Sequence, residues 1–289
     1  MQIGAVFPQT EIEPDPAAIR SYAEGVERLG FKHLLTYDHV LGADPALHPG
    51  WSGPYDVRTT FHEPLVLFGF LAAITALELV TGIIILPQRQ TALVAKQSAE
   101  VDILTQGRFR LGVGLGWNAV EYEALGKGFD DRGRRVEEQV ELLRRLWTEP
   151  TVSHRGRYER VTGAGLAPLP VQRPIPIWFG ASSDRALRRA GRLADGWFPQ
   201  AAPGPELKRA RDVVEAGATE AGRDVSQLGM DARVSLGGGP GELADLAGQW
   251  RLAGATHLSI NTMGQGLGSA AAHLEALAAS ASVLALLPG

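Results

Sequence analysis

An imidazole beside a carboxylate is the pair of side chains in this chain best suited to moving a proton. The segment Tyr37-Asp38-His39 follows the short apolar run His33–Thr36. A histidine takes up or gives up a proton near neutral pH, and an adjacent carboxylate can orient or tune it. A hydrogen-bonded histidine without a catalytic role would leave the same sequence. We interpret His39 as a candidate catalytic residue because it stands at the end of a predicted strand.

A glycine-rich segment offers a second kind of chemistry, close contact between backbone and ligand. Gly112, Gly114 and Gly116 alternate with apolar residues. Glycines spaced in this way let a backbone lie against a planar or phosphorylated ligand. The dinucleotide fingerprint needs Gly-x-Gly-x-x-Gly at the start of a helix, whereas Trp117 follows here, so a nicotinamide Rossmann site is not expected. Gly114 and Gly116 are candidate cofactor contacts; the alternative is that these glycines only let a strand and a helix pack closely.

A third candidate is an anion site in the segment Gly180-Ala181-Ser182-Ser183, which leads into a helix predicted from Asp184. Free backbone N–H groups, serine hydroxyls and the helix dipole together suit a phosphate. Ser183 could equally be a simple helix N-cap, and both roles are compatible.

The fourth candidate is a glycine inside a β-branched run, at Thr81-Gly82-Ile83. Glycine in a buried strand often marks a bulge or the close approach of a ligand. The alternative is tight packing within the sheet.

Short apolar runs and helical patterns alternate along almost the whole chain, and these elements must position the candidate residues. The runs lack a period of two, as expected for parallel strands covered on both faces. The predicted strands are Gln2–Phe7, His33–Thr36, Val80–Leu86, Arg108–Val113, Ile175–Gly180, Gly196–Pro199, Met230–Ser235 and His257–Ile260. The predicted helices are Pro16–Leu29, Glu63–Leu77, Ala92–Leu104, Asp131–Leu146, Asp184–Arg192, Pro205–Ala221, Pro240–Leu252 and Gly268–Leu286.

Eight such pairs predict an α/β fold, a (β/α)8 TIM barrel forming one domain over residues 1–289; an open doubly wound sheet is the alternative. Two segments rich in proline and glycine interrupt the alternation. Gly42–His62 follows the second strand and is expected at the active-site end of the barrel. Thr148–Pro174 precedes the fifth strand, and its place is left open. Loops of this length usually carry function or act as lids, so both could shape a substrate pocket.

Composition excludes several classes of protein. The chain has 289 residues, a net charge of -4 and no cysteine, so disulfides and thiolate metal sites are excluded and a reducing cytoplasm is expected. The mild acidity without a basic run argues against nucleic-acid binding. The longest apolar run, Leu65–Leu77, is shorter than the ~20 residues that span a bilayer. The N-terminus has no positive charge before its apolar residues, so no signal peptide is expected.

Other polar groups give no further motif. No metal-ligand spacing such as His-Glu-x-x-His and no Gly-x-Ser-x-Gly nucleophile motif occurs, so no metal site is expected. Arg132, Arg134 and Arg135 have carboxylates at helical spacings and are interpreted as a solvated, salt-bridged helix face.

At these residues the chain resembles the luciferase-like monooxygenase superfamily, and most closely its branch of deazaflavin-dependent (coenzyme F420) oxidoreductases. The resemblance runs from Ile3 to about Pro199, and the last third of the chain matches only in its alternating pattern. The residues that carry it are Ile3-Gly4, Phe7-Pro8-Gln9, Asp38-His39, Thr81-Gly82, Leu86-Pro87, Ala95-Lys96-Gln97, Leu104 through Arg108, Leu111 through Trp117, Glu121-Tyr122, Ala124-Leu125-Gly126, Arg132 through Arg135, Leu146-Trp147, Pro168 through Pro176, Gly180-Ala181-Ser182, Arg188-Arg189-Ala190 and Asp195-Gly196-Trp197.

The resemblance implies a barrel with insertions, commonly a homodimer, that holds coenzyme F420, or FMN as the alternative, at the carboxyl ends of the strands. Deazaflavin members carry an Asp-His pair after the second strand, like Asp38 and His39. They have a strained, often cis, peptide in the third strand behind the ring, which would fall within Thr81-Gly82-Ile83. Their phosphate contacts include a loop after the fifth strand, like Gly180–Ser183.

One departure concerns the substrate. A sugar-phosphate dehydrogenase of this branch has a glutamate in the loop after the fourth strand, where this chain has Gly114-Leu115-Gly116-Trp117. The resemblance therefore argues against a sugar-phosphate substrate.

We expect an oxidoreductase that transfers a hydride between F420 and a small organic substrate, with His39 as the proton donor or acceptor. One alternative is a monooxygenase that takes reduced FMN from a separate flavin reductase, and another is a non-catalytic flavin-binding barrel. A cofactor-free sugar-phosphate isomerase would need a carboxylate base, and none stands at a predicted strand end.

Overall fold

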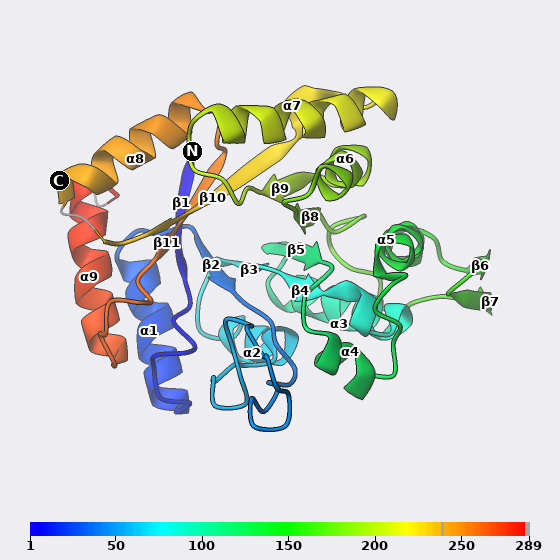
Figure 1. The fold of residues 1–289 in the computed structure, drawn as a ribbon, viewed down its shortest axis with the longest axis horizontal. Coiled ribbons are helices and arrows are strands. Elements are labelled where there is room, and N and C mark those ends of the chain that lie inside the picture. The colour runs from blue at the N-terminus through cyan, green and yellow to red at the C-terminus, as the bar shows by residue number, and fades with distance from the viewer. Residues whose placement is uncertain (238–239, 287–289) are drawn as a thin grey trace.

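The chain forms a closed barrel of parallel strands with helices outside it (Figure 1), as the sequence predicts. This computed structural model describes residues 1–237 and 240–286; positions 238–239 and 287–289 of the expected domain lie outside that part. The sheet runs in the order β3-β2-β1-β11-β10-β9-β8-β5-β4, and pairing of β3 with β5 closes it. The strands are β1 (Gln2–Val6), β2 (His33–Thr36), β3 (Glu78–Thr81), β4 (Ile84–Ile85), β5 (Phe109–Gly114), β8 (Ile177–Gly180), β9 (Gly196–Phe198), β10 (Gly229–Ser235) and β11 (His257–Asn261).

The helices follow the predicted pattern, with one clear exception. They are α1 (Pro16–Arg28), α2 (Pro64–Leu71), α3 (Thr91–Leu104), α5 (Arg132–Thr148), α6 (Asp184–Leu193), α7 (Pro205–Glu220), α8 (Pro240–Leu252) and α9 (Ala270–Val283). The prediction of a helix to Leu77 is wrong, since α2 ends at Leu71. The Thr75 hydroxyl accepts the Leu77 N–H in a turn, so the apolar run spans a helix end and the buried entry to β3. None of the described helices has the length and apolar character needed to cross a bilayer.

The predicted third strand, Val80–Leu86, is in fact two short strands with an interruption at Gly82-Ile83. The peptide bond between these two residues is cis, which confirms the expected irregularity at this place. A Cβ atom on Gly82 would overlap the side chain of Leu35 on the neighbouring strand. Packing inside the barrel therefore requires a glycine here, as the alternative interpretation held.

Two layers of side chains fill the barrel below its mouth. Alternate residues of each strand point inward. Nearer the mouth the layer is apolar and consists of Val6, Leu35, Val80, Trp178 and Phe198. Nearer the amino ends of the strands lies a second set, His33, Glu78, Arg110, Asp231 and Ser259, which we call the polar layer.

The polar layer is internally paired, and its members are buried except Glu78, whose side chain is 23% exposed. Arg110 contacts Glu78 at 2.9 Å and Asp231 at 3.2 Å. Ser259 donates to Asp231 at 3.0 Å and lies 2.8 Å from the Nε2 atom of His33. Burial, together with the positive charge of Arg110, lowers the pKa of His33 far below its ordinary value, so this imidazole is neutral.

The two irregular segments have different places. The segment 37–63, after β2, lies beside α2 and α4 (Ala119–Ala124) at one end of the barrel (Figure 1). The segment before β8 contains a hairpin, β6 (Val152–Arg155) and β7 (Arg160–Ala164), that projects from the side of the molecule (Figure 1). The carboxylate of Glu138 on α5 holds the hairpin turn by accepting backbone N–H groups, including that of Glu159 at 2.8 Å. The sequence predicted neither α4 nor the hairpin.

Candidate functional site

A cavity of about 710 Å³ opens at the carboxyl ends of the strands. The structure brings together there all but one of the predicted site residues, namely Asp38, His39, Gly82, Ile83, Gly114, Gly116, Gly180, Ala181, Ser182 and Ser183. No residue of the segment 148–174 lines it, so the suggestion that this segment shapes the pocket is wrong. The segment 42–62 contributes Tyr55.

Thr81 is the predicted contact that does not line the cavity. Its side chain is fully buried, and its hydroxyl donates to the carbonyl of Gly112 at 2.8 Å. Because Thr81 precedes the interruption, its side chain links β3 to β5 inside the wall. The structure therefore gives Thr81 a packing role in place of the predicted contact with a cofactor.

The glycines at the mouth make room for an isoleucine. A Cβ atom on Gly114 would lie 2.5 Å from Cδ1 of Ile83, and one on Gly180 would lie 3.3 Å from Cγ2 of the same side chain. Gly116 has a φ of +66°, and a Cβ atom on it would lie 2.8 Å from Cγ2 of Ile85. These glycines bring strands close together, as the alternative interpretation held, and they set Ile83 as an apolar surface in the cavity wall.

His39 stands in an aromatic cluster at the cavity edge. Its ring centroid lies 4.8 Å from that of Phe61, 5.1 Å from that of Tyr55 and 5.6 Å from that of Trp117. Phe61 and Tyr55 belong to the segment after β2, whereas Trp117 follows the glycine-rich loop. The His39 side chain keeps 12% of its surface exposed, so a ligand in the cavity can reach it.

The carboxylate that faces His39 is Glu121, which the sequence interpretation did not assign to the site. Glu121 Oε2 lies 3.5 Å from His39 Nδ1, and its other oxygen accepts the backbone N–H groups of Val40 and Leu41. The side-chain amide of Gln88 donates to Oε2 of Glu121 at 3.1 Å. Burial by itself would raise the pKa of Glu121, but these hydrogen bonds outweigh burial and lower it, so the side chain is a carboxylate.

The sequence feature that marks Glu121 is the start of a helix. Asn118 accepts the N–H groups of Val120 and Glu121 as an N-cap, and the pattern Asn-x-x-Glu is typical of the first turn of a helix. That pattern predicts the short helix α4 but not that its glutamate points at a histidine in the loop after β2.

Asp38 does not pair with His39, the residue next to it in the sequence. Its carboxylate accepts from Arg89 at 2.8 Å and from the backbone N–H of Ile85 at 3.0 Å. Burial raises its pKa, and the positive charge of Arg89 opposes that effect. Successive residues on an extended chain point to opposite sides. Asp38 therefore anchors the chain after the interruption, and Glu121 orients His39.

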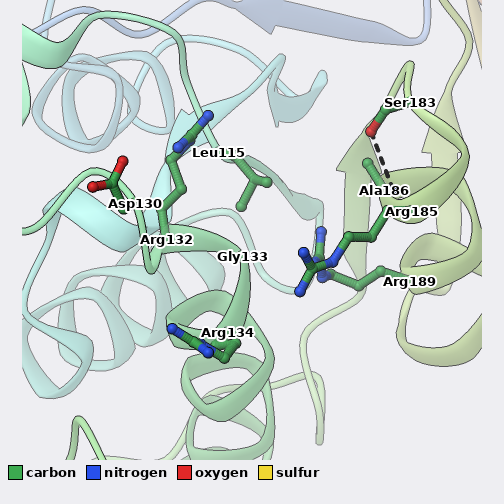
Figure 2. Close-up of a pocket in the computed structure, with 9 residues that line it drawn as sticks. All are labelled: Leu115, Asp130, Arg132, Gly133, Arg134, Ser183, Arg185, Ala186 and Arg189. Atoms are coloured by element: carbon green, nitrogen blue, oxygen red, sulfur yellow. Dashed lines mark hydrogen bonds between the residues drawn. The ribbon is translucent and has the colours of Figure 1, made fainter.

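A second, smaller cavity of about 310 Å³ adjoins the first and is lined by arginines (Figure 2). The two cavities share Leu115, Arg132, Ser183 and Ala186. Arg132 and Arg134 come from the first turn of α5, and Arg185 and Arg189 extend from α6 toward it (Figure 2). We call this cavity the arginine pocket.

The arginine pocket corrects the interpretation of the arginine cluster. Arg135 pairs with Asp131 at 3.6 Å and not with a glutamate later on the helix, and Arg132 and Arg134 line the pocket. The buried Nε atom of Arg132 has no hydrogen-bond partner in the described part of the chain. The N-termini of α5 and α6 both reach this pocket, and such termini favour anions.

Ser183 serves as a helix cap at the edge of the same pocket. Its hydroxyl accepts the N–H of Ala186 at 3.4 Å (Figure 2), which confirms the N-cap interpretation. Ser182 and Ser183 are both exposed toward the cavities, so the capping role leaves the segment accessible to an anion. In the described residues no group of three His, Asp or Glu side chains could hold a metal ion.

Comparisons with known proteins place this architecture among redox enzymes. An F420-dependent glucose-6-phosphate dehydrogenase of Segniliparus rotundus is 30% identical over 230 residues, 77% of this chain and 64% of that protein. An FMNH2-dependent dimethylsulfone monooxygenase of Pseudomonas putida is 31% identical over 219 residues, 74% of this chain and 57% of that protein. The solved structure of an F420-dependent secondary alcohol dehydrogenase with an F420-acetone adduct matches with a TM-score of 0.77 at 20% identity, covering 96% of this chain and 98% of that one. The family model that describes luciferase-like monooxygenases matches residues 1–276, and the chain belongs to that family of oxidoreductases and monooxygenases.

Proposed function

We propose that this protein is an oxidoreductase that transfers a hydride between coenzyme F420 and a small organic substrate. The arginine pocket is the observation that carries the choice of cofactor. FMN ends at its phosphate, whereas F420 continues beyond its phosphate into a tail of carboxylates. Asp130 also lines this cavity, and Arg189 is paired with Glu137 at 2.7 Å, which leaves Arg132, Arg134 and Arg185 without a carboxylate partner among the described residues. An anion site that extends past Ser183 to these three arginines suits the longer, more acidic molecule.

The residues of the two cavities fit the parts of such a cofactor. Ile83 offers an apolar surface on which a flat ring can lie, and the segment Gly180–Ser183 offers N–H and hydroxyl groups for the phosphate. When bound, the deazaflavin would supply the hydride chemistry. His39 faces the same cavity, and the Glu121 carboxylate holds the imidazole so that it can take up or give up the substrate's proton.

Cofactor binding tests the proposal directly. F420 and FMN are titrated separately into the anaerobic protein, and the dissociation constants are compared between wild type, Arg185→Gln and Arg188→Gln. Arg185 lines the arginine pocket, while Arg188, on the same helix, pairs with Glu220 outside it. We expect Arg185→Gln to weaken F420 binding by about tenfold, since a hydrogen bond to a charged group contributes ~1.5–3 kcal/mol. Arg188→Gln should bind F420 as the wild type does.

The alternatives give different results in the same experiment. Tight binding of FMN without binding of F420 would reject the proposal and favour a monooxygenase supplied by a separate flavin reductase. Binding of F420 without turnover in a substrate screen that follows deazaflavin absorbance would favour a non-catalytic barrel.

We further propose that the protein acts as a homodimer through α2 and α3. Val66 and Phe70, one turn apart on α2, are 70% and 36% exposed, and Leu93 on the adjoining α3 is 52% exposed. Exposed apolar side chains on neighbouring helices are typical of contact surfaces. Val66→Lys should convert a dimer to a monomer in light scattering after size exclusion, whereas Leu252→Lys, at a 90% exposed position on α8, should not. A wild-type monomer at micromolar concentration would reject this.

A further inference from the structure

One arginine in the large cavity lies away from the arginine pocket and has no acidic partner. Arg233 is on β10, two residues after Asp231 of the polar layer, so both side chains point into the barrel. Asp231 is fully buried, whereas Arg233, one step nearer the mouth, is partly exposed and lines the cavity.

The contacts of Arg233 are neutral. Its Nη2 atom donates to Oε1 of Gln200 at 2.8 Å, and its guanidinium carbon lies 5.8 Å from the ring centroid of Tyr37. No carboxylate of the described residues lies within 4.0 Å of it. Two arginines whose side chains are largely covered differ: Arg89 has Asp38 at 2.8 Å and Arg110 has Glu78 at 2.9 Å. A cation in the cavity is thus left available to an anion from outside the chain.

Two tyrosines line the cavity together with this cation. Burial raises the pKa of both Tyr37 and Tyr55, against the opposing effect of the Arg233 charge, so their hydroxyls remain protonated donors at neutral pH. With the guanidinium they make a group of hydrogen-bond donors that suits a carboxylate.

Tyr55 also connects this group to the candidate proton-transfer residue. Its ring centroid lies 5.1 Å from that of His39, and it lines the same cavity as Arg233. A ligand lying along Tyr55 would therefore have one end at Arg233 and the other at His39. The ring of Trp117, whose centroid lies 5.6 Å from that of His39, adds an apolar surface to the same cavity.

The place of Arg233 in the barrel separates it from the residues that suit a cofactor. Gly82 and Ile83, Gly114, and Gly180 through Ser183 belong to neighbouring barrel strands, β3–β4, β5 and β8. Arg233 comes from β10, with β9 between it and β8 on one side and β11, β1 and β2 between it and β3 on the other. A cofactor whose ring and tail lie along β3–β4, β5 and β8 would leave the β10 side of the cavity, with Arg233, to the substrate.

We propose that the substrate is a small organic acid whose carboxylate binds Arg233, Tyr37 and Tyr55 and whose apolar body lies along Tyr55, with its reacting carbon next to His39. This inference rests on the proposed function, because it assigns a substrate class to the same site.

The test uses benzoate and its uncharged counterpart benzamide as probes, with the protein loaded with F420 and, separately, without it. Calorimetric titrations compare wild type, Arg233→Met and Arg185→Gln. We expect wild type to bind benzoate at least tenfold more tightly than benzamide. Arg233→Met should lose about 10- to 100-fold in benzoate affinity and keep its F420 affinity. Arg185→Gln should lose F420 affinity and keep its benzoate affinity.

Three results would overturn the inference. Equal affinity of the wild type for benzoate and benzamide would show that no anion site exists in this wall. Unchanged benzoate binding by Arg233→Met would place that site elsewhere. Loss of F420 binding by Arg233→Met, with circular dichroism unchanged, would make Arg233 a cofactor contact. If Arg233→Met does not fold, the wild-type comparison and Tyr55→Phe, which should weaken benzoate about tenfold, decide the matter. A protein that binds benzoate as expected but not F420 would reject the proposed cofactor and leave the anion site standing.

Discussion

Glu121 offers the sharpest test of how this site is held together. It is fully buried, and its carboxylate accepts from the backbone of Val40 and Leu41 and from Gln88 while it faces His39. Replacing it with alanine leaves these donors without an acceptor. Hydrogen bonds to a charged group contribute ~1.5–3 kcal/mol each and are not additive, so we expect Glu121→Ala to lose about 3–5 kcal/mol of unfolding free energy.

Glu121→Gln isolates the charge, because glutamine keeps the size and one acceptor oxygen. We expect it to lose about 1–2 kcal/mol at pH 7.5, measured by urea denaturation. The folded-state pKa of Glu121 is lowered from 4.5, so its stabilisation is fully present above pH 4.5 and disappears as the pH falls through the folded-state value. The difference between wild type and Glu121→Gln should therefore shrink below that pH.

Glu123→Gln, on the exposed side of α4, is the matched control and should match wild type. Measurement of turnover distinguishes a role of Glu121 in positioning His39 from a role in stability alone. Proton transfer by a placed side chain contributes ~100- to 10,000-fold, so loss of His39 orientation in Glu121→Gln should cost part of that factor in kcat, with F420 affinity unchanged. A Glu121→Gln protein with the stability and pH–rate profile of Glu123→Gln would refute the assignment of Glu121 as the residue that orients His39.

Three other predictions follow from the geometry. His39→Ala should lower kcat by ~100-fold or more and leave F420 affinity within a few-fold; unchanged turnover would remove its proton-transfer role. Gly114→Val should lose ~1–3 kcal/mol of stability by overlap with Ile83, and Ile83→Ala should recover part of it in a double-mutant cycle; additive effects would refute the contact. Burial, with the nearby charge of Arg110, lowers the pKa of His257 from 6.5 to about 3, so its stabilisation is present above pH 6.5 and disappears as the pH falls toward 3. Between pH 7.5 and 5, wild type should lose ~1–2 kcal/mol more than His257→Gln in urea denaturation, and parallel curves would contradict this.

The barrel itself could be predicted from the sequence because buried parallel strands and their covering helices leave separate periodic signals. The errors came where local signals and packing diverge. The apolar run after Glu63 does not mark the end of α2, since buried helix and buried strand entry have the same composition. The interruption at Gly82 could be suspected from one glycine, but not that Leu35 is what excludes a side chain there.

The site was predicted less completely, for a physical reason. Its residues come from separate strands, and which of them meet depends on strand order and side-chain direction. Asp38 is the neighbour of His39 in sequence, yet Glu121 is its neighbour in space. Arg132 and Arg134 have the spacing of a solvated helix face, and only the position of α6 makes them the wall of a pocket.

The polar layer at the amino ends of the strands has a consequence for how the chain reaches this fold. His33 meets Ser259 across 226 residues of sequence, and Arg110 meets Asp231 across 121. Neither contact can form until both halves of the chain are present, and long-range contacts of this kind slow folding. A chain stopped before β10 would leave Arg110 without Asp231 and His33 without Ser259. The barrel therefore should not accumulate as a stable amino-terminal half during synthesis, and truncated chains should need a chaperone or aggregate.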